Sequence, residues 1–240
     1  MKRDIVERLL AARETSRPVA LVTDLNTGLQ TLVYEDAVHG GFGLEDDLLA
    51  EVRERLRQDR SGLITDADGD DDEDGLRLFV QTHNPPLRLL VVGAVHIAQA
   101  LAPLAALTGY AVTVIDPRGA FATESRFPGV SLHDGWPDEA LAALTIDSRT
   151  AVVTLTHDPK LDDPALLVAL RSPAFYVGSL GSRRTHAKRL ERLKEQGVTD
   201  AELARIHAPV GLAIGAVTPA EIALSVMAQI TAVRRKADAA

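Results

Sequence analysis

The stretch LRLLVVGAVHIAQALAPLAALTGYAVTVIDPR, residues 87–118, decides the fold class. Residues 87–92 form an apolar run, which suits a central strand buried on both faces of a sheet. A helix is predicted over about 96–108 and a second strand over 111–115. Because a long helix separates the two strands, the connection is a crossover and the strands are predicted to be parallel.

The same alternation of strand and helix continues toward the C-terminus. The last helix is marked by Thr218-Pro219-Ala220-Glu221, a capping box with proline at the first helical position. These patterns predict an α/β fold over residues 85–235, in which a Rossmann-like parallel sheet is flanked by helices. The remaining predicted elements are strands over 130–132, 150–155 and 174–177, and helices over 137–144, about 163–170, the segment after 182 to about 196, and 219 to about 235.

Residues 1–84 predict a separate, smaller α+β domain, which a chain of 240 residues can accommodate. Two β-rich runs flank Asn26-Thr27-Gly28 and predict a hairpin. The paired prolines at 85 and 86 predict a stiff, extended connector to the second domain. The other predicted elements are helices over 4–14 and 44–56, hairpin strands over 19–23 and 29–34, and short strands over 63–65 and 76–80.

An acidic block, DADGDDDED, occupies residues 66–74. Like charges repel one another, so the block predicts a solvated loop. A calcium-binding loop is the alternative interpretation, but the glutamate that should end such a loop is missing at the required offset.

Composition excludes several classes of function. A net charge of -8 gives no basic surface for nucleic acid. No apolar stretch reaches the ~18 residues that span a bilayer, and no signal peptide is visible, so a cytoplasmic protein without a membrane partner is expected. The absence of cysteine excludes disulfides, thiolate metal sites and a cysteine nucleophile.

Ligands of open parallel sheets bind beyond the carboxyl ends of the strands. The first turn there, Gly93-Ala94-Val95-His96, lies where a dinucleotide-binding fingerprint would lie, and Asp116 follows Gly93 by 23 residues, as a ribose-binding acid would. Val95 takes the place of the second glycine and should obstruct a pyrophosphate, which disfavours NAD(P). His96 is predicted either to contact a ligand or to cap the helix.

The second and third turns each carry charged or titratable groups. Arg118, two residues after Asp116, is predicted either to hold a phosphate or carboxylate or to form a surface salt bridge. His157 lies among aspartates, and could act as a base or as half of a metal site, although a single histidine is a weak metal signal. The alternative for this turn is a network that bonds the loop backbone.

The fourth turn predicts the best anion site of the chain. Gly178 and Gly181 lead into a helix that begins at Ser182 and Arg183. Free backbone N–H groups and the helix dipole favour an anion at this position. The alternative is an ordinary helix cap followed by a solvated basic face through Lys188, Arg189 and Arg192. Further along, Gly211 and Gly215 predict close backbone packing against a ligand or against the sheet.

Together, GAVHIAQALAPLAALTGYAVTVIDPR, RFPG, TAVVTLTHDPKLDDPAL, YVGSLGSRRTHAKRLERL and PVGLAIGAVTPAEIALSVMAQI resemble the XdhC/CoxI family over residues 87–230. The resemblance implies a Rossmann-like C-terminal domain and a maturation factor, often dimeric, that binds the molybdenum cofactor and delivers it to a molybdenum hydroxylase of the xanthine or carbon monoxide dehydrogenase type. Positions that match the family are Gly93, His96, Asp116, Arg118, His157, Gly178, Gly181, Ser182, Gly211, Gly215 and Glu221.

The N-terminal domain departs from this family. Gly40-Gly41, with Glu45 displaced by one position, is similar to the family's Gly-Gly-x-x-Glu stretch, whereas its Gly-Ser-Pro-Arg-like and Cys-Gly-Gly stretches are missing. Without cysteine the chain cannot hold molybdenum through a thiolate, although its turns could still hold the pterin phosphate.

These features favour a binding and delivery protein over an enzyme. In this hypothesis Ser182 and the start of its helix take the cofactor's phosphate, while Asp116 and Arg118 contact its polar ring system. An NAD(P)-dependent oxidoreductase that uses the Gly93 turn, Asp116 and His157 is the first alternative. A degenerate regulatory scaffold for the same partner enzymes is the second, supported by the missing N-terminal motifs.

Overall fold

The computed structural model describes residues 2–65 and 75–236. The chain forms two compact units, Met1–Pro85 and Pro86–Ala240. The acidic block at 66–74, with its predicted loop and the calcium-binding alternative, lies outside the described residues.

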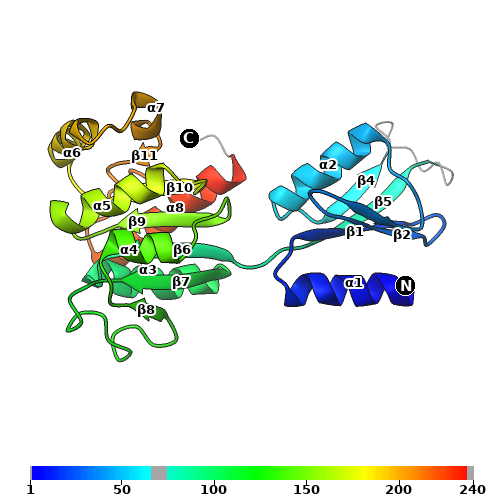
Figure 1. Cartoon of the computed structure of the whole chain (residues 1–240), viewed down its shortest axis with the longest axis horizontal. Coiled ribbons are helices and arrows are strands. Elements are labelled where there is room, and N and C mark those ends of the chain that lie inside the picture. The colour runs from blue at the N-terminus through cyan, green and yellow to red at the C-terminus, as the bar shows by residue number, and fades with distance from the viewer. Residues whose placement is uncertain (1, 66–74, 237–240) are drawn as a thin grey trace. The chain divides into compact units, whose positions relative to one another are not determined.

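The first unit is an antiparallel sheet with one helix on each face (Figure 1). Side chains alternate along β1, so that Val19 and Leu21 pack on the side of α1 while Ala20 and Val22 pack on the side of α2. The strand order is β3-β2-β1-β5-β4. The elements are α1 (Arg3–Glu14), β1 (Val19–Asp24), β2 (Gln30–Val33), β3 (Val38–Gly40), α2 (Asp46–Arg57), β4 (Gly62–Thr65) and β5 (Arg77–His83).

The second unit is a parallel sheet in the order β11-β10-β9-β6-β7-β8. Chain order reverses between β6 and β9, which makes this pair the topological switch point of a doubly wound sheet. The strands are β6 (Leu87–Val92), β7 (Tyr110–Ile115), β8 (Ser131–His133), β9 (Thr150–Thr154), β10 (Tyr176–Ser179) and β11 (Ile206–His207).

Helices cover both faces of this sheet, so β6 is buried on both sides. Leu89 and Val91 pack with α3 and α8, and Leu90 and Val92 pack with α4, α5 and α6. The α/β fold class with its Rossmann-like sheet is therefore as predicted. The helices are α3 (His96–Leu107), α4 (Pro137–Ala143), α5 (Pro159–Leu170), α6 (Arg183–Glu195), α7 (Asp200–Leu203) and α8 (Pro219–Arg235).

Three elements were not predicted, and one predicted helix is longer than the range given for it. The strands β3 and β11 and the helix α7 are two to four residues long, too short for a periodic pattern. Helix α5 contains the predicted 163–170 and begins earlier, at Pro159, because the Asp158 side chain accepts a hydrogen bond from the Lys160 N–H and caps the helix there.

Within residues 2–65 and 75–236, no helix combines the length and the apolar character that crossing a bilayer requires.

Candidate functional site

The turns after β6 and β9 meet at the switch point through a glycine. Gly93 has φ +109°, and a Cβ placed on it would lie 2.6 Å from Cγ2 of Thr156. Both the backbone conformation and the space require glycine here. Gly93 therefore brings the first and third predicted turns into contact.

Asp116, directly after β7, is fully buried and ties the second turn to the first. One carboxylate oxygen accepts the Ala94 N–H at 2.8 Å, and both oxygens pair with Arg118, whose Nε and Nη2 lie at 2.9 and 2.8 Å. Burial raises the pKa of Asp116, but the hydrogen bonds from Arg118 and Ala94 outweigh burial, and the net shift of the pKa is downward. The salt bridge, one of the two roles considered for Arg118, is what the structure shows.

The start of α3 has no side-chain cap. Val95 is the N-cap residue and packs partly against the core, while His96 is the first helical residue and is exposed. The alternative that His96 caps the helix is therefore wrong. Its imidazole forms no hydrogen bond with any residue that the structure describes, so it is available at the switch point.

Asp162 organises the third turn from the first part of α5. Its side chain is 1% exposed and accepts hydrogen bonds from the Thr156 hydroxyl at 2.6 Å and the His157 N–H at 3.1 Å. Burial raises the pKa of this carboxyl. His157 has φ +61°, in the left-handed region. The turn is thus a backbone-bonding network, as one of the alternatives proposed, and the imidazole is not part of it. Among the residues placed by the structure, no cluster of three or more His, Asp or Glu side chains could hold a metal ion.

The fourth turn begins α6 with a side-chain cap. The Ser182 hydroxyl accepts the Thr185 N–H at 3.1 Å and lies 2.9 Å from the Thr185 hydroxyl. Arg183 is exposed at the first helical position. Gly178 is needed for packing, because a Cβ there would lie 2.7 Å from Val210 Cγ2. Gly181 has φ +142°, which suits glycine.

The two later glycines differ from each other. A Cβ on Gly211 would collide with the Ser225 side chain of α8, and its N–H donates to Gln229 at 2.9 Å. Gly215 has open space around it and φ +77°. Gly211 therefore packs closely, but against helix α8 and not against the sheet or a ligand as predicted, while Gly215 is open.

The sheet brings the four turns to one edge. The Leu155 N–H donates to Val92, the Leu180 N–H donates to Thr154, and the Ala94 N–H donates to Asp116. The residues proposed from the sequence that lie at or just beyond these strand ends are Gly93, His96, Asp116, Arg118, His157, Gly178, Gly181, Ser182 and Arg183.

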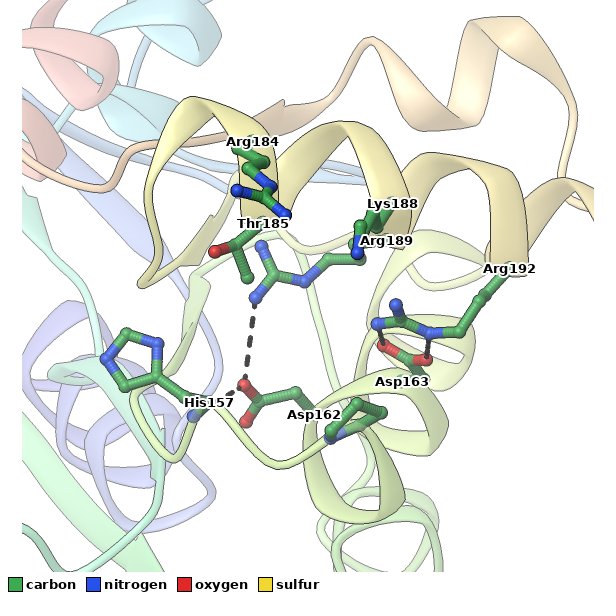
Figure 2. Close-up of a pocket in the computed structure, with 9 residues that line it drawn as sticks. His157, Asp162, Asp163, Arg184, Thr185, Lys188, Arg189 and Arg192 are labelled. Atoms are coloured by element: carbon green, nitrogen blue, oxygen red, sulfur yellow. Dashed lines mark hydrogen bonds and ion pairs between the residues drawn. The ribbon is translucent and has the colours of Figure 1, made fainter.

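A pocket of about 160 Å³ lies between α5 and α6 (Figure 2). Its walls carry four cations and two carboxylates, a formal charge of +2 in a chain whose net charge is -8. His157 and Thr185 complete its polar lining. The cations are Arg184, Lys188, Arg189 and Arg192, and the carboxylates are Asp162 and Asp163.

Arg189 was predicted to lie on a solvated basic face, and that prediction was wrong. Its side chain is 2% exposed because it turns inward toward Asp162, with Nη2 2.8 Å from the Leu180 carbonyl oxygen and 3.8 Å from the Asp162 carboxylate. The spacing of 184, 188, 189 and 192 on one side of α6 is a signal for a common face. The sequence pattern does not show that Asp162 and Asp163 of α5 lie opposite this face of α6.

Comparison with known proteins agrees with the fold. The protein-family model of the XdhC Rossmann domain matches residues 89–230 of this sequence. A crystal structure of a xanthine dehydrogenase from Bacillus halodurans aligns with a TM-score of 0.74 over 98% of this chain and 67% of that one; at 23% identity this likeness supports the fold alone.

Two curated relatives have descriptive names. The molybdenum cofactor insertion chaperone PaoD of Escherichia coli K12 is 39% identical over 62% of this chain and 41% of its own length. A Bacillus subtilis 168 protein named as a probable xanthine dehydrogenase component is 35% identical over 66% of this chain and 46% of its own.

A third relative, the E. coli K12 protein YqeB, is 37% identical over 82% of this chain and 38% of its own length. The chain thus spans less than half the length of these curated relatives. Since the family model covers more than half of the chain and agrees with the sheet described above, the protein belongs to the XdhC family.

Proposed function

We propose that the protein binds the molybdenum cofactor and assists its insertion into a molybdenum hydroxylase of the xanthine or carbon monoxide dehydrogenase type. The observation that carries this proposal is the gathering of four polar turns at one edge of a parallel sheet, in a chain 39% identical to a molybdenum cofactor insertion chaperone. The resemblance to the family also suggests a homodimer and an apo-enzyme partner.

The residues at this edge fit the pterin and phosphate parts of such a cargo better than its metal. The available groups are the exposed imidazole of His96 and the cations of α6. The chain has no cysteine, so no thiolate can coordinate the metal. The cargo would therefore be held by hydrogen bonds and charge, which permits its release to a partner.

The residues at the switch point support an NAD(P)-dependent oxidoreductase less well than they support cofactor delivery. Val95 occupies the position where a second glycine would admit the pyrophosphate. Asp116, at the position of a ribose-binding acid, already accepts four hydrogen bonds, three of them from Arg118. Its carboxylate is therefore not free to receive a ribose hydroxyl.

The test is to purify the full chain from cells that make the cofactor and to measure bound pterin after oxidation to its fluorescent form. We expect pterin to co-purify, and we expect His96→Gln to reduce its amount per protein. His39→Gln, which changes a partly exposed histidine in the other unit, should leave it unchanged. NADH binding measured by fluorescence titration in the absence of any pterin would favour the oxidoreductase, and binding of neither would favour the scaffold.

A further inference from the structure

We propose that the pocket between α5 and α6 is a binding site for a phosphate monoester, with Arg189 as its buried donor and Arg184 and Lys188 as its outer cations. The proposal concerns a place different from the capped helix start at Ser182. Only its link to the cargo rests on the proposed function.

The first observation that supports this site is the state of the Arg189 side chain. Its Nε and Nη1 are buried and have no hydrogen-bond partner in the part of the chain that the structure describes. Buried polar groups are nearly always hydrogen-bonded, and a buried donor without an acceptor is costly. Since the guanidinium lines the pocket, an acceptor bound there would lie beside it and would satisfy donors that the protein leaves open.

The carboxylates of the pocket face Arg189 but form no hydrogen bond with it among the described residues. Asp162 uses its oxygens for the Thr156 hydroxyl and the His157 N–H, and its distance of 3.8 Å from Arg189 is longer than a hydrogen bond. Asp163 pairs through both oxygens with Arg192, at 2.5 and 3.0 Å. Figure 2 marks the long ion pair between Arg189 and Asp162 and the separate, close pair between Arg192 and Asp163.

The outer cations are free to meet a ligand. Arg184 and Lys188 are exposed and form no ion pair with the residues of the described segments. Arg184 lies in the first turn of α6, where the helix dipole also favours a negative charge. A dianion would thus meet an excess of positive charge on one wall of the pocket.

The size of the pocket limits the ligand. Pockets for drug-sized molecules are on the order of 300–1,000 Å³, and this pocket is about 160 Å³. It can hold a phosphate group but not a whole nucleotide or pterin. The rest of such a molecule would extend outward, where His157 lies at the β9 strand end.

The test uses the full chain and inorganic phosphate as the probe, with binding measured by calorimetry. We expect the double variant Arg184→Gln, Lys188→Gln to weaken phosphate binding about tenfold to a hundredfold, because each charge-assisted hydrogen bond to an anion is lost. Lys194→Gln changes a cation at the far end of the same helix, outside the pocket, and should leave phosphate affinity unchanged.

A second variant tests the buried donor. Arg189→Lys keeps the positive charge but removes the guanidinium donors, and we expect it to weaken phosphate binding about tenfold. If this variant does not fold, the double variant of exposed residues still decides. Phosphate affinity that is unchanged in the double variant, or lowered equally in Lys194→Gln, would overturn the proposal.

Competition identifies the source of the phosphate. The oxidised pterin derivative of the cofactor with its phosphate, the same compound after phosphatase treatment, and AMP are each added against bound phosphate. Competition by the phosphorylated pterin alone supports both the pocket and the cargo. Competition by AMP as well supports the pocket as a general phosphomonoester site. Pterin that co-purifies equally with wild type and the double variant, while phosphate binding is lost, supports the pocket and contradicts its link to the cargo.

Discussion

Two aspartate–arginine pairs lie near the carboxyl edge of the parallel sheet, and they are built differently. Asp116 and Arg118 are joined through both carboxylate oxygens, and Arg118 is 43% exposed. Asp162 and Arg189 are both almost fully buried but 3.8 Å apart. In the first pair the acid and the base satisfy each other, whereas in the second the acid serves the loop backbone and the base keeps two open donors.

Because the two pairs differ in this way, substitutions in the first pair should affect folding stability, and substitutions in the second should affect ligand binding. A carboxylate that accepts a backbone N–H and a bidentate arginine fixes two turns, so its loss should affect folding. A buried guanidinium with open donors lowers stability until an acceptor arrives, so its effect should be seen when a ligand is present. Substitutions at the switch point and in the pocket between α5 and α6 should therefore fall into two classes.

The largest effect on stability is expected from Gly93→Ala at the switch point. A Cβ there meets Thr156 at 2.6 Å and must adopt φ +109°, so both overpacking and backbone strain are introduced. We expect the free energy of unfolding to fall by about 2–4 kcal/mol in urea titrations. Adding Thr156→Ser removes the colliding methyl group and should recover part of the loss. Equal stability of Gly93→Ala and wild type would show that the two turns do not pack as described.

The second-largest loss of folding stability is expected from Asp116→Asn. The amide cannot accept all four hydrogen bonds of the carboxylate, and it places a donor opposite the donors of Arg118 or Ala94. We expect a loss of about 1–3 kcal/mol in the free energy of unfolding, at the lower end because Arg118 is partly exposed to solvent. Asp200→Asn, an exposed aspartate of α7, is the control and should change stability little.

The pH dependence of this loss has a defined sign. Because hydrogen bonding lowers the pKa of Asp116 in the folded state, the advantage of wild type over Asp116→Asn is complete above the unfolded pKa of about 3.9. It disappears as the pH falls through the folded value. Unfolding measured from pH 6 downward should show the two proteins converging, and a constant difference would contradict the ionised pair.

Asp162 should show the opposite dependence. Burial raises the pKa of its carboxyl, so the folded state binds the proton more tightly than the unfolded state. The stability of wild type relative to Asp162→Asn should then decline as the pH rises from about 4 through the folded pKa of Asp162. Denaturant titrations of both proteins over this range measure the slope, and a slope of the same sign as that of Asp116 would end the contrast between the two pairs.

The helices and strands that could be predicted from sequence are those that a local pattern, such as an apolar run or a helix cap, determines. The strand Leu87–Val92 follows from its apolar run, and α8 follows from a capping box at Thr218 that the structure contains in full. The strand Ile206–His207 could not be predicted, because two residues carry no periodicity and only pairing with β10 defines them. The predicted range 163–170 lies within α5, but the start of this helix at Pro159 was not predicted, because the Asp158 cap was not recognised.

The candidate site likewise has residues that could be predicted from local sequence and residues whose position depends on packing between distant elements. Glycines and charged residues after strands marked the carboxyl edge, since chain order alone places them there. The burial of Arg189 depends on Asp162, 27 positions earlier and on another helix, so no local pattern reveals it. A row of cations on one side of α6 has the same spacing whether it faces water or a pocket, and only the packing of α5 distinguishes the two.

The smallest effect on stability is expected from Arg184→Gln, and this variant tests the contrast most directly. Arg184 is exposed, so the free energy of unfolding without ligand should stay within about 0.5 kcal/mol of wild type. With phosphate at a hundred times its dissociation constant, wild type should gain about 2.7 kcal/mol, and the variant should gain distinctly less because its affinity is lower. Lys194→Gln should behave as wild type in both conditions. An equal gain in all three proteins would place the bound anion elsewhere, and the open donors of Arg189 would then be only a cost of packing α6 against α5.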